Sequence, residues 1–275
     1  MKENFSDKHP LASLLLFSYG SFVIAEFLIG VIVTMLLAPT GVDKEMVLAI
    51  CGSIGSLLIL VFWYLRNRPQ YRFMPRKGEI SGSFKLMIGP KLFLWVMIFG
   101  LYAYFAKGSP FGPIGLKEVF MCLMAGLVEE VCFREIAVSF MAKHWLNEKT
   151  IPWIAVASGV LFGLTHLANG IGDDVIAALE QTVLTVFFGI FYAAVYLCKG
   201  NVWVSCFFHV VHDLLAFMAV AGMAGIGELP DWTVVYMMFI EFILSLIGFY
   251  YLRKEKRQEI IDLWDYKWSR KETSE

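Results

Sequence analysis

Six ionisable side chains with the chemistry of peptide hydrolysis lie in segments of the chain that are otherwise strongly apolar. Hydrolysis of a peptide bond needs a base for water, an acid for the leaving amine, and hydrogen-bond donors for the oxyanion. A charge within a hydrocarbon layer costs about 2.5–3.5 kcal/mol even on insertion scales, so such residues are expected to face inward and to be paired. They are Glu129, Glu130, Arg134, His166, His209 and Asp213.

The first cluster combines two adjacent glutamates with an arginine. Glu130 and Arg134 are four residues apart and share one face of a helix, which predicts an ion pair within that helix. Glu129 points about 100° away, toward the face of the small residue Ala125, where another helix can approach. Because a desolvated carboxylate is suited to act as a general base near neutral pH, we assign that role to Glu129.

The histidines lie on two further helices. Gly159 and Gly163 form the small-residue pattern of closely packed membrane helices, and His166 follows on nearly the same face. His209 and Asp213 are four residues apart and share a face of another helix. A single buried histidine is often only a hydrogen-bonding residue between helices, but three ionisable clusters on three helices favour one common polar site.

The elements that must position these side chains are membrane-spanning helices. The chain has 275 residues, of which 58% are hydrophobic and only 17% are charged, too apolar for an ordinary soluble domain. About 20 mostly apolar residues cross a hydrocarbon layer as a helix. The pattern predicts an all-α polytopic membrane bundle of about eight transmembrane helices, forming a single integral membrane domain over residues 1–275. The predicted helices cover residues 11–38, 46–65, 86–106, 114–141, 151–171, 175–198, 202–225 and 231–252.

The basic residues predict a multi-pass protein of the cell membrane with both termini cytoplasmic. Of 23 lysines and arginines, nineteen, Lys91 among them, are assigned to the side of the N-terminus and three to the other side. Cytoplasmic loops are enriched in such residues. The charged tail, residues 253–275, is expected on the cytoplasmic side, either as an amphipathic helix on the bilayer surface or as a solvated segment.

Other features are interpreted as structural or as exclusions. The net charge of −1 gives no indication of nucleic-acid binding. The five cysteines show neither a C-x-x-C pair nor the spacing of a secreted disulfide framework, and are interpreted as small buried residues. Glu26 and Glu241, lone acids in the first and last predicted helices, are interpreted as packing or water-facing residues.

Three short motifs, in this order and on three helices, resemble those of the CAAX-protease and bacteriocin-processing family of intramembrane peptidases, also called the Abi family. They are Glu129-Glu130-x-x-x-Arg134, Phe162-x-x-x-His166 and His209-x-x-x-Asp213. The resemblance covers about residues 114–220, which we take as the peptidase core. It implies an endopeptidase that acts on a peptide or membrane-associated protein in or at the bilayer.

The resemblance also implies roles for the motif residues. Glu129 and His166 would activate a water molecule for attack on the peptide carbonyl. Glu130 would support the site, and Arg134 would brace it as a structural residue.

The last motif leaves one role open. His209 and Asp213 would bind the oxyanion or orient the water, but the eukaryotic CAAX enzyme has asparagine where this chain has Asp213. An ionised carboxylate cannot donate a hydrogen bond to an oxyanion. Either Asp213 is protonated, or it orients His209 and His209 alone donates.

Other functions remain open at this stage. Glutamate and histidine are also zinc ligands, but the helical H-E-x-x-H spacing is absent, so a mechanism without metal or other cofactor is preferred. The same fold could instead serve as a non-catalytic membrane immunity or regulatory binding protein. An ion-coupled transporter is less favoured, because the sequence shows no internal repeat.

Overall fold

The computed structural model describes residues 5–37, 41, 43–68, 70–76, 78–107, 109, 111–171, 174–222 and 230–269. Within these ranges all regular structure is helical, which confirms the predicted all-α class. Two short π-helical turns, η1 and η3, and one 3-10 turn, η4, interrupt the α-helices. The elements are α1 (Phe5–Lys8), α2 (Pro10–Val23), η1 (Ile24–Leu28), α3 (Ile29–Leu37), α4 (Lys44–Asn67), α5 (Glu79–Ala106), α6 (Leu116–Glu130), η3 (Val131–Ile136), α7 (Ala137–Trp145), α8 (Ile151–Thr165), η4 (His166–Gly170), α9 (Val175–Lys199), α10 (Val202–Gly222), α11 (Trp232–Tyr251) and α12 (Lys254–Lys267).

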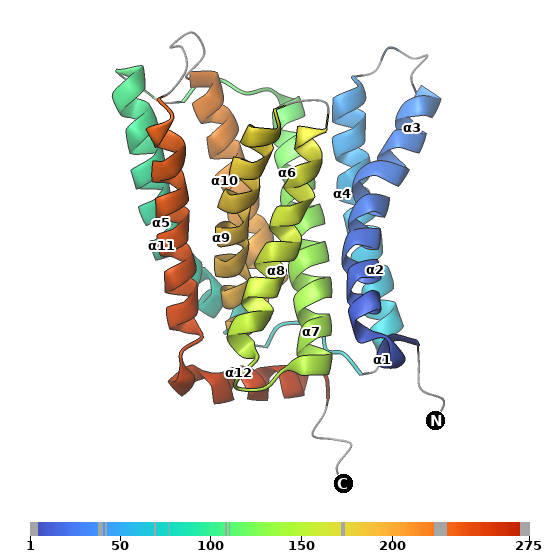
Figure 1. The fold of residues 1–275 in the computed structure, drawn as a ribbon. Helices are drawn as coiled ribbons and strands as arrows, with labels where there is room; N and C mark the ends of the chain where they lie inside the picture. Colours follow the sequence, from blue (N-terminus) through green and yellow to red (C-terminus); the bar gives the residue numbers. More distant parts are fainter. Residues whose placement is uncertain are drawn as a thin grey trace.

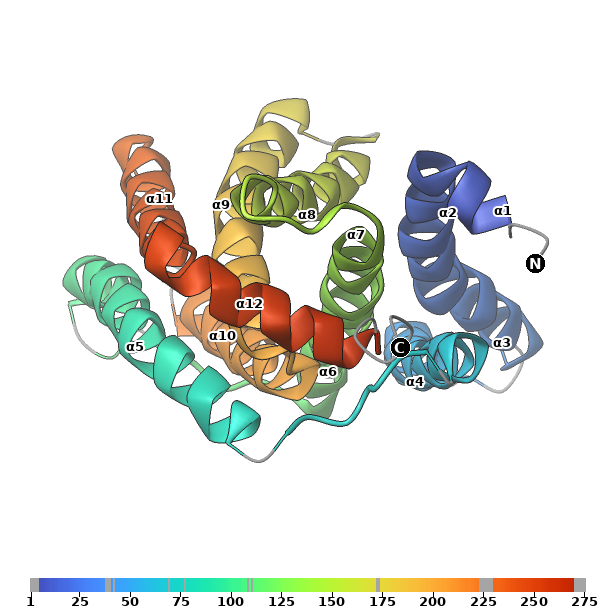
Figure 2. The same cartoon turned by 90° about the horizontal axis from the view of Figure 1, so that it is seen from below.

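The helices form an upright bundle with the predicted site at its centre. Helices α2, α3 and α4 lie along one side and α5 and α11 along the other, with α6 to α10 between them (Figures 1 and 2). Helix α9 packs against both α8 and α11, and α6 packs against both α4 and α10. The central helices α6, α8 and α10 carry all three sequence motifs.

Seven helices of the described chain are long and apolar enough to cross a membrane. The predicted fourth span is also helical, as one continuous rod from Leu116 to Trp145, but it is not among the seven because it carries several ionisable residues. At 1.5 Å per residue this rod is about 45 Å long, which exceeds a hydrocarbon layer of roughly 30 Å. Figure 1 shows it spanning the same height as its neighbours.

Close packing of α8 against α9 confirms the interpretation of the glycine pattern. A Cβ atom on Gly159 would lie 2.7 Å from the carbonyl oxygen of Val186, and one on Gly163 would lie 2.9 Å from that of Thr182. Only glycine permits this approach, because real Cβ atoms do not come so near to backbone atoms. His166 follows at the end of α8, so its position depends on this contact.

The described part of the charged tail forms helix α12, which lies across the end of the bundle (Figures 1 and 2). Its Trp264 is fully buried against the bundle. A buried Glu135 near this end accepts hydrogen bonds of 2.6 Å from the hydroxyls of both Tyr71 and Tyr196. Of the two alternatives for the tail, the structure shows the helix; residues 270–275 lie outside the described residues.

Candidate active site

A cavity of about 490 Å³ lies among η1, α6, α8, α9 and α10. Four predicted site residues line it: Glu129, His166, His209 and Asp213. The other two, Glu130 and Arg134, are fully buried behind it. The structure therefore brings the three motifs together, with four side chains able to meet a substrate and two that can act only through their neighbours.

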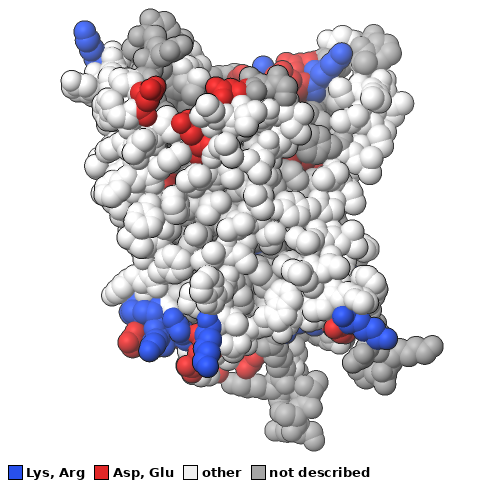
Figure 3. Space-filling model, in the orientation of Figure 1, with Lys and Arg blue, Asp and Glu red and all other residues white. Residues whose placement is uncertain are grey.

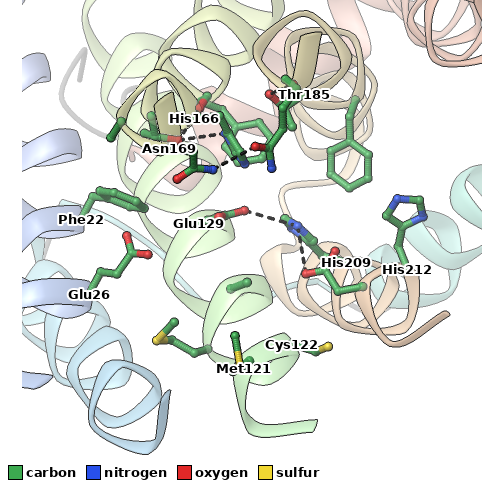
Figure 4. A pocket seen from close by; sticks show the side chains of 18 of the residues that line it. Phe22, Glu26, Met121, Cys122, Glu129, His166, Asn169, Thr185, His209 and His212 are labelled. Carbon is green, nitrogen blue, oxygen red and sulfur yellow. Dashed lines mark hydrogen bonds and ion pairs between the residues drawn. The ribbon is translucent and has the colours of Figure 1, made fainter. Parts of the chain in front are cut away.

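His209 is the centre of the polar contacts. Its Nδ1 lies 2.9 Å from Oε1 of Glu130. Its Nε2 lies 3.3 Å from Oε2 of Glu129 (Figure 4). The Nε2 atom is also 3.7 Å from Oδ2 of Asp213, one helical turn along α10. Both ring nitrogens thus face carboxylates, and an imidazolium ion, which donates from both nitrogens, fits these surroundings.

The predicted ion pair within the fourth helix is present. Arg134 Nε lies 3.2 Å from Glu130 Oε2, and both side chains are fully excluded from solvent. The contact is an ion pair without the alignment of a hydrogen bond. The guanidinium carbon also lies 4.6 Å from the ring centre of Phe162 and 5.6 Å from that of Tyr192. Two aromatic faces and one carboxylate therefore hold this cation behind His209.

His166 approaches the cavity from the end of α8. Its Nδ1 lies 3.2 Å from the hydroxyl oxygen of Thr165, and its ring meets the Phe162 ring edge-on at 5.1 Å. The Phe162 ring also meets His209 edge-on at 6.1 Å, so one aromatic ring contacts both histidines. Glu129 is held by His209 in this arrangement, and both motif histidines line the same cavity (Figure 4).

Glu26 lines the cavity as well, a position that the sequence interpretation of packing or contact with water did not anticipate. It lies in the π-helical turn η1, and π-turns within α-helices are frequent at functional sites. Glu129 lies between Glu26 on one side and His209 on the other (Figure 4). The signal in the sequence was an isolated acid within an apolar run.

A second set of polar residues lies where α10 meets α5. His212 lines the cavity, and its Nδ1 accepts a hydrogen bond of 3.2 Å from Trp95 Nε1 on α5. Lys91 on α5 is fully buried, with its Nζ 4.4 Å from the ring centre of Phe188. The assignment of Lys91 to the cytoplasmic side was therefore wrong, because α5 begins at Glu79 and carries Lys91 into the bundle.

The histidine and carboxylate side chains of this cavity are of the types that bind zinc. Among the described residues, no three histidine, cysteine, aspartate or glutamate side chains come together in a way that could hold a metal ion. Of the three carboxylates around His209, those of Glu129 and Asp213 face its Nε2 and that of Glu130 faces its Nδ1 on the opposite side of the ring. The residues present do not fit a zinc site of three or four convergent ligands, and the mechanism below is derived without one.

Part of the chain matches the model of a known protein family. Residues 114–215 match the model of the family described as type II CAAX prenyl endopeptidase Rce1-like. This match confirms the resemblance to CAAX proteases predicted from the motifs. A search of curated proteins found no match, and a search of solved structures found none.

The segment matched to the CAAX endopeptidase family includes all six predicted site residues, from Glu129 to Asp213. Glu26 and Lys91 lie on helices that precede it. Together with the seven apolar helices, the match supports a multi-pass membrane protein of the CAAX-peptidase type.

Proposed function

We propose that the chain is an intramembrane endopeptidase in which Glu129 is the base that activates water. The observation that carries this proposal is the shared cavity, which Glu129, His166 and His209 reach from three different helices. Glu129 keeps 14% of its side chain exposed there, whereas the neighbouring Glu130 keeps none. Only the first of the two adjacent glutamates can therefore contact a water molecule and a peptide.

The reaction follows from the contacts of His209. Glu129, with His166, takes a proton from water, and the hydroxide adds to the peptide carbonyl carbon. His209 Nε2–H, which faces Glu129 in the free site, turns to the developing oxyanion while Glu130 holds Nδ1. The C–N bond then breaks as Glu129 returns its proton to the leaving amine. In this scheme Asp213 orients His209 as a carboxylate and does not donate.

The lining of the cavity limits the substrate. It contains the carboxylates of Glu26, Glu129 and Asp213 and, among the residues that the structure describes, no lysine or arginine. A neutral or cationic peptide segment next to the scissile bond suits this surface better than an anionic one, because a further buried negative charge would be unpaired. Aromatic and methionine side chains form much of the remaining wall and favour apolar residues.

The cavity also indicates the side of access. It extends from Glu129 back along α6 to Met121 and along the end of α8, away from α12. Lysines and arginines gather at the α12 end of the molecule, and few lie at the opposite end (Figure 3). The positive-inside rule then assigns the α12 end and both termini to the cytoplasm. Under this orientation the substrate enters from the outer half of the membrane.

The proposal is tested with the purified full-length chain in lipid nanodiscs. A library of short apolar peptides is incubated with the protein, and new termini are identified by mass spectrometry. Cleavage at defined positions, resistant to metal chelators, is expected. Binding of peptides with no cleavage under any condition would instead favour the immunity or regulatory alternative, and cleavage that chelators abolish would restore the zinc mechanism.

A further inference from the structure

A second cavity lies at the basic end of the bundle, where α5, α9, α11 and α12 meet. It has a volume of about 240 Å³ and no connection in its lining to the proposed active site. One wall is formed by Tyr250 and Tyr251 at the end of α11. The charged wall is formed by Lys199, Arg253, Lys256 and Glu259.

The charges of this cavity do not balance. Lys199 and Lys256 share a single carboxylate, with Nζ atoms 3.5 Å and 3.0 Å from the two oxygens of Glu259. The hydrogen bond from Lys256 holds the pKa of Glu259 below its ordinary value, so this carboxylate stays ionised. Arg253 lies over the Tyr250 ring at 4.2 Å, and its contact with the exposed Glu255 is long, at 3.8 Å. Three cations around one lining carboxylate leave about two positive charges for a ligand.

The position of the cavity points to the bilayer surface. Helix α12 lies across the bundle end in the plane expected of an interfacial amphipathic helix (Figure 2). Helix α12 begins at Lys254, directly after the lining residue Arg253, and the side chain of this N-cap residue does not cap the helix N–H groups. The positive end of the helix dipole therefore adds to the positive charge of the cavity. Above the cavity, Phe242, Leu246 and Tyr250 of α11 expose one apolar stripe at helical spacing. Tyrosines are typical of the depth at which lipid headgroups lie.

We propose that this cavity binds the phosphate headgroup of an anionic phospholipid, with Lys199, Arg253 and Lys256 as its cationic contacts. The acyl chains then run along the exposed stripe of α11 toward the middle of the membrane. Because the lipid contacts α9, α11 and α12 together, it stabilises the docking of α12 onto the bundle. Ligand binding to the folded state alone raises the unfolding midpoint by mass action.

The experiment uses the full-length protein in nanodiscs of phosphatidylcholine alone, or of phosphatidylcholine and phosphatidylglycerol in equal parts. Native mass spectrometry after gentle release counts retained phosphatidylglycerol, and a thermal scan gives the unfolding midpoint. The double substitution Lys199→Gln and Lys256→Gln is expected to weaken phosphatidylglycerol retention by about tenfold to thirtyfold. It should also remove the difference in midpoint between the two lipid mixtures.

A matched control removes two charges from the same end of the molecule outside the cavity. Lys85 and Lys149 are exposed and do not line it, so Lys85→Gln with Lys149→Gln should leave retention within about twofold. Retention by the Lys199 and Lys256 variant equal to that of wild type would overturn the proposal. Equal loss of lipid by the Lys199 and Lys256 variant and by the control would also overturn it, because the loss would then reflect general surface charge.

Two further measurements test the proposal independently of the double lysine variant. Glu259→Gln frees both lysines from their shared carboxylate and should strengthen retention, even where the double lysine variant folds poorly. Inorganic phosphate is added to protein in phosphatidylcholine alone as the test of a lipid-independent anion site. If phosphate raises the midpoint as much as phosphatidylglycerol does, the cavity is a phosphate site and the lipid assignment is wrong.

Discussion

Replacing Arg134 with methionine should destabilise the folded protein without touching the cavity. The side chain is fully buried and forms an ion pair with Glu130 at 3.2 Å. Methionine fills a similar volume between the aromatic rings, so the change removes chiefly the positive charge. Glu130 then keeps only its contact with His209, at 2.9 Å.

The size of the effect follows from that lost partner. Removing one member of a buried ion pair costs about 3–5 kcal/mol, and His209, which also faces Glu129 and Asp213, compensates the remaining charge of Glu130 only in part. Whole domains are stable by only about 5–15 kcal/mol, so the loss is a large part of the total. The double variant Arg134→Met with Glu130→Gln should recover much of it, because no unpaired charge remains and such a replacement is often neutral.

Unfolding of the purified protein in detergent, followed by tryptophan fluorescence, measures these differences. Lys85→Met, a change of the same kind at an exposed position of α5, is the control and should stay within about 0.5 kcal/mol of wild type. Two results would refute the reasoning. One is an Arg134→Met protein as stable as wild type, and the other is a double variant as unstable as the single one.

Three further predictions concern the site and the orientation. Asp213→Asn should lower kcat strongly, because asparagine cannot orient an imidazolium as a carboxylate does; full activity would show that Asp213 works as a donor. Gly159→Ala should reduce kcat by displacing His166, since its Cβ would lie 2.7 Å from a carbonyl oxygen of α9, and wild-type kcat would contradict this coupling. In intact cells, a membrane-impermeant thiol reagent should label a cysteine at exposed Ser109 and not one at exposed Gln70; the reverse pattern would invert the proposed orientation.

Local spacing predicted most of what lies within one helix. The four-residue separation of Glu130 and Arg134 gave their ion pair, and Gly159 with Gly163 gave the close approach of α8 to α9. Helix boundaries were mostly within a few residues of those observed, because apolar runs and their breakers are explicit in a membrane sequence. The main exception is α5, which begins at Glu79 rather than at residue 86.

Most side-chain contacts between different helices could not be predicted from spacing. Glu26 enters the cavity through the π-helical turn η1, and a π-turn shifts the face on which a side chain emerges. Lys91 enters the bundle because α5 starts early, and nothing in its local sequence shows that it lies over Phe188. Glu129 and Glu130 both contact His209, an arrangement that depends on the rotation of α10 against α6.

The central claim is that Glu129 is the base of a hydrolytic site, and one comparison of rates tests it most directly. Cleavage of the best library peptide is measured for purified wild type, for Glu129→Gln, and for Glu180→Gln, a change of the same kind on α9 outside the cavity lining. Thermal unfolding of each protein verifies that it is folded. Loss of a general base lowers the rate by about 10²–10⁴-fold, so Glu129→Gln should fall by this factor while Glu180→Gln stays near wild type. A folded Glu129→Gln protein that cleaves the peptide at the wild-type rate would contradict the account.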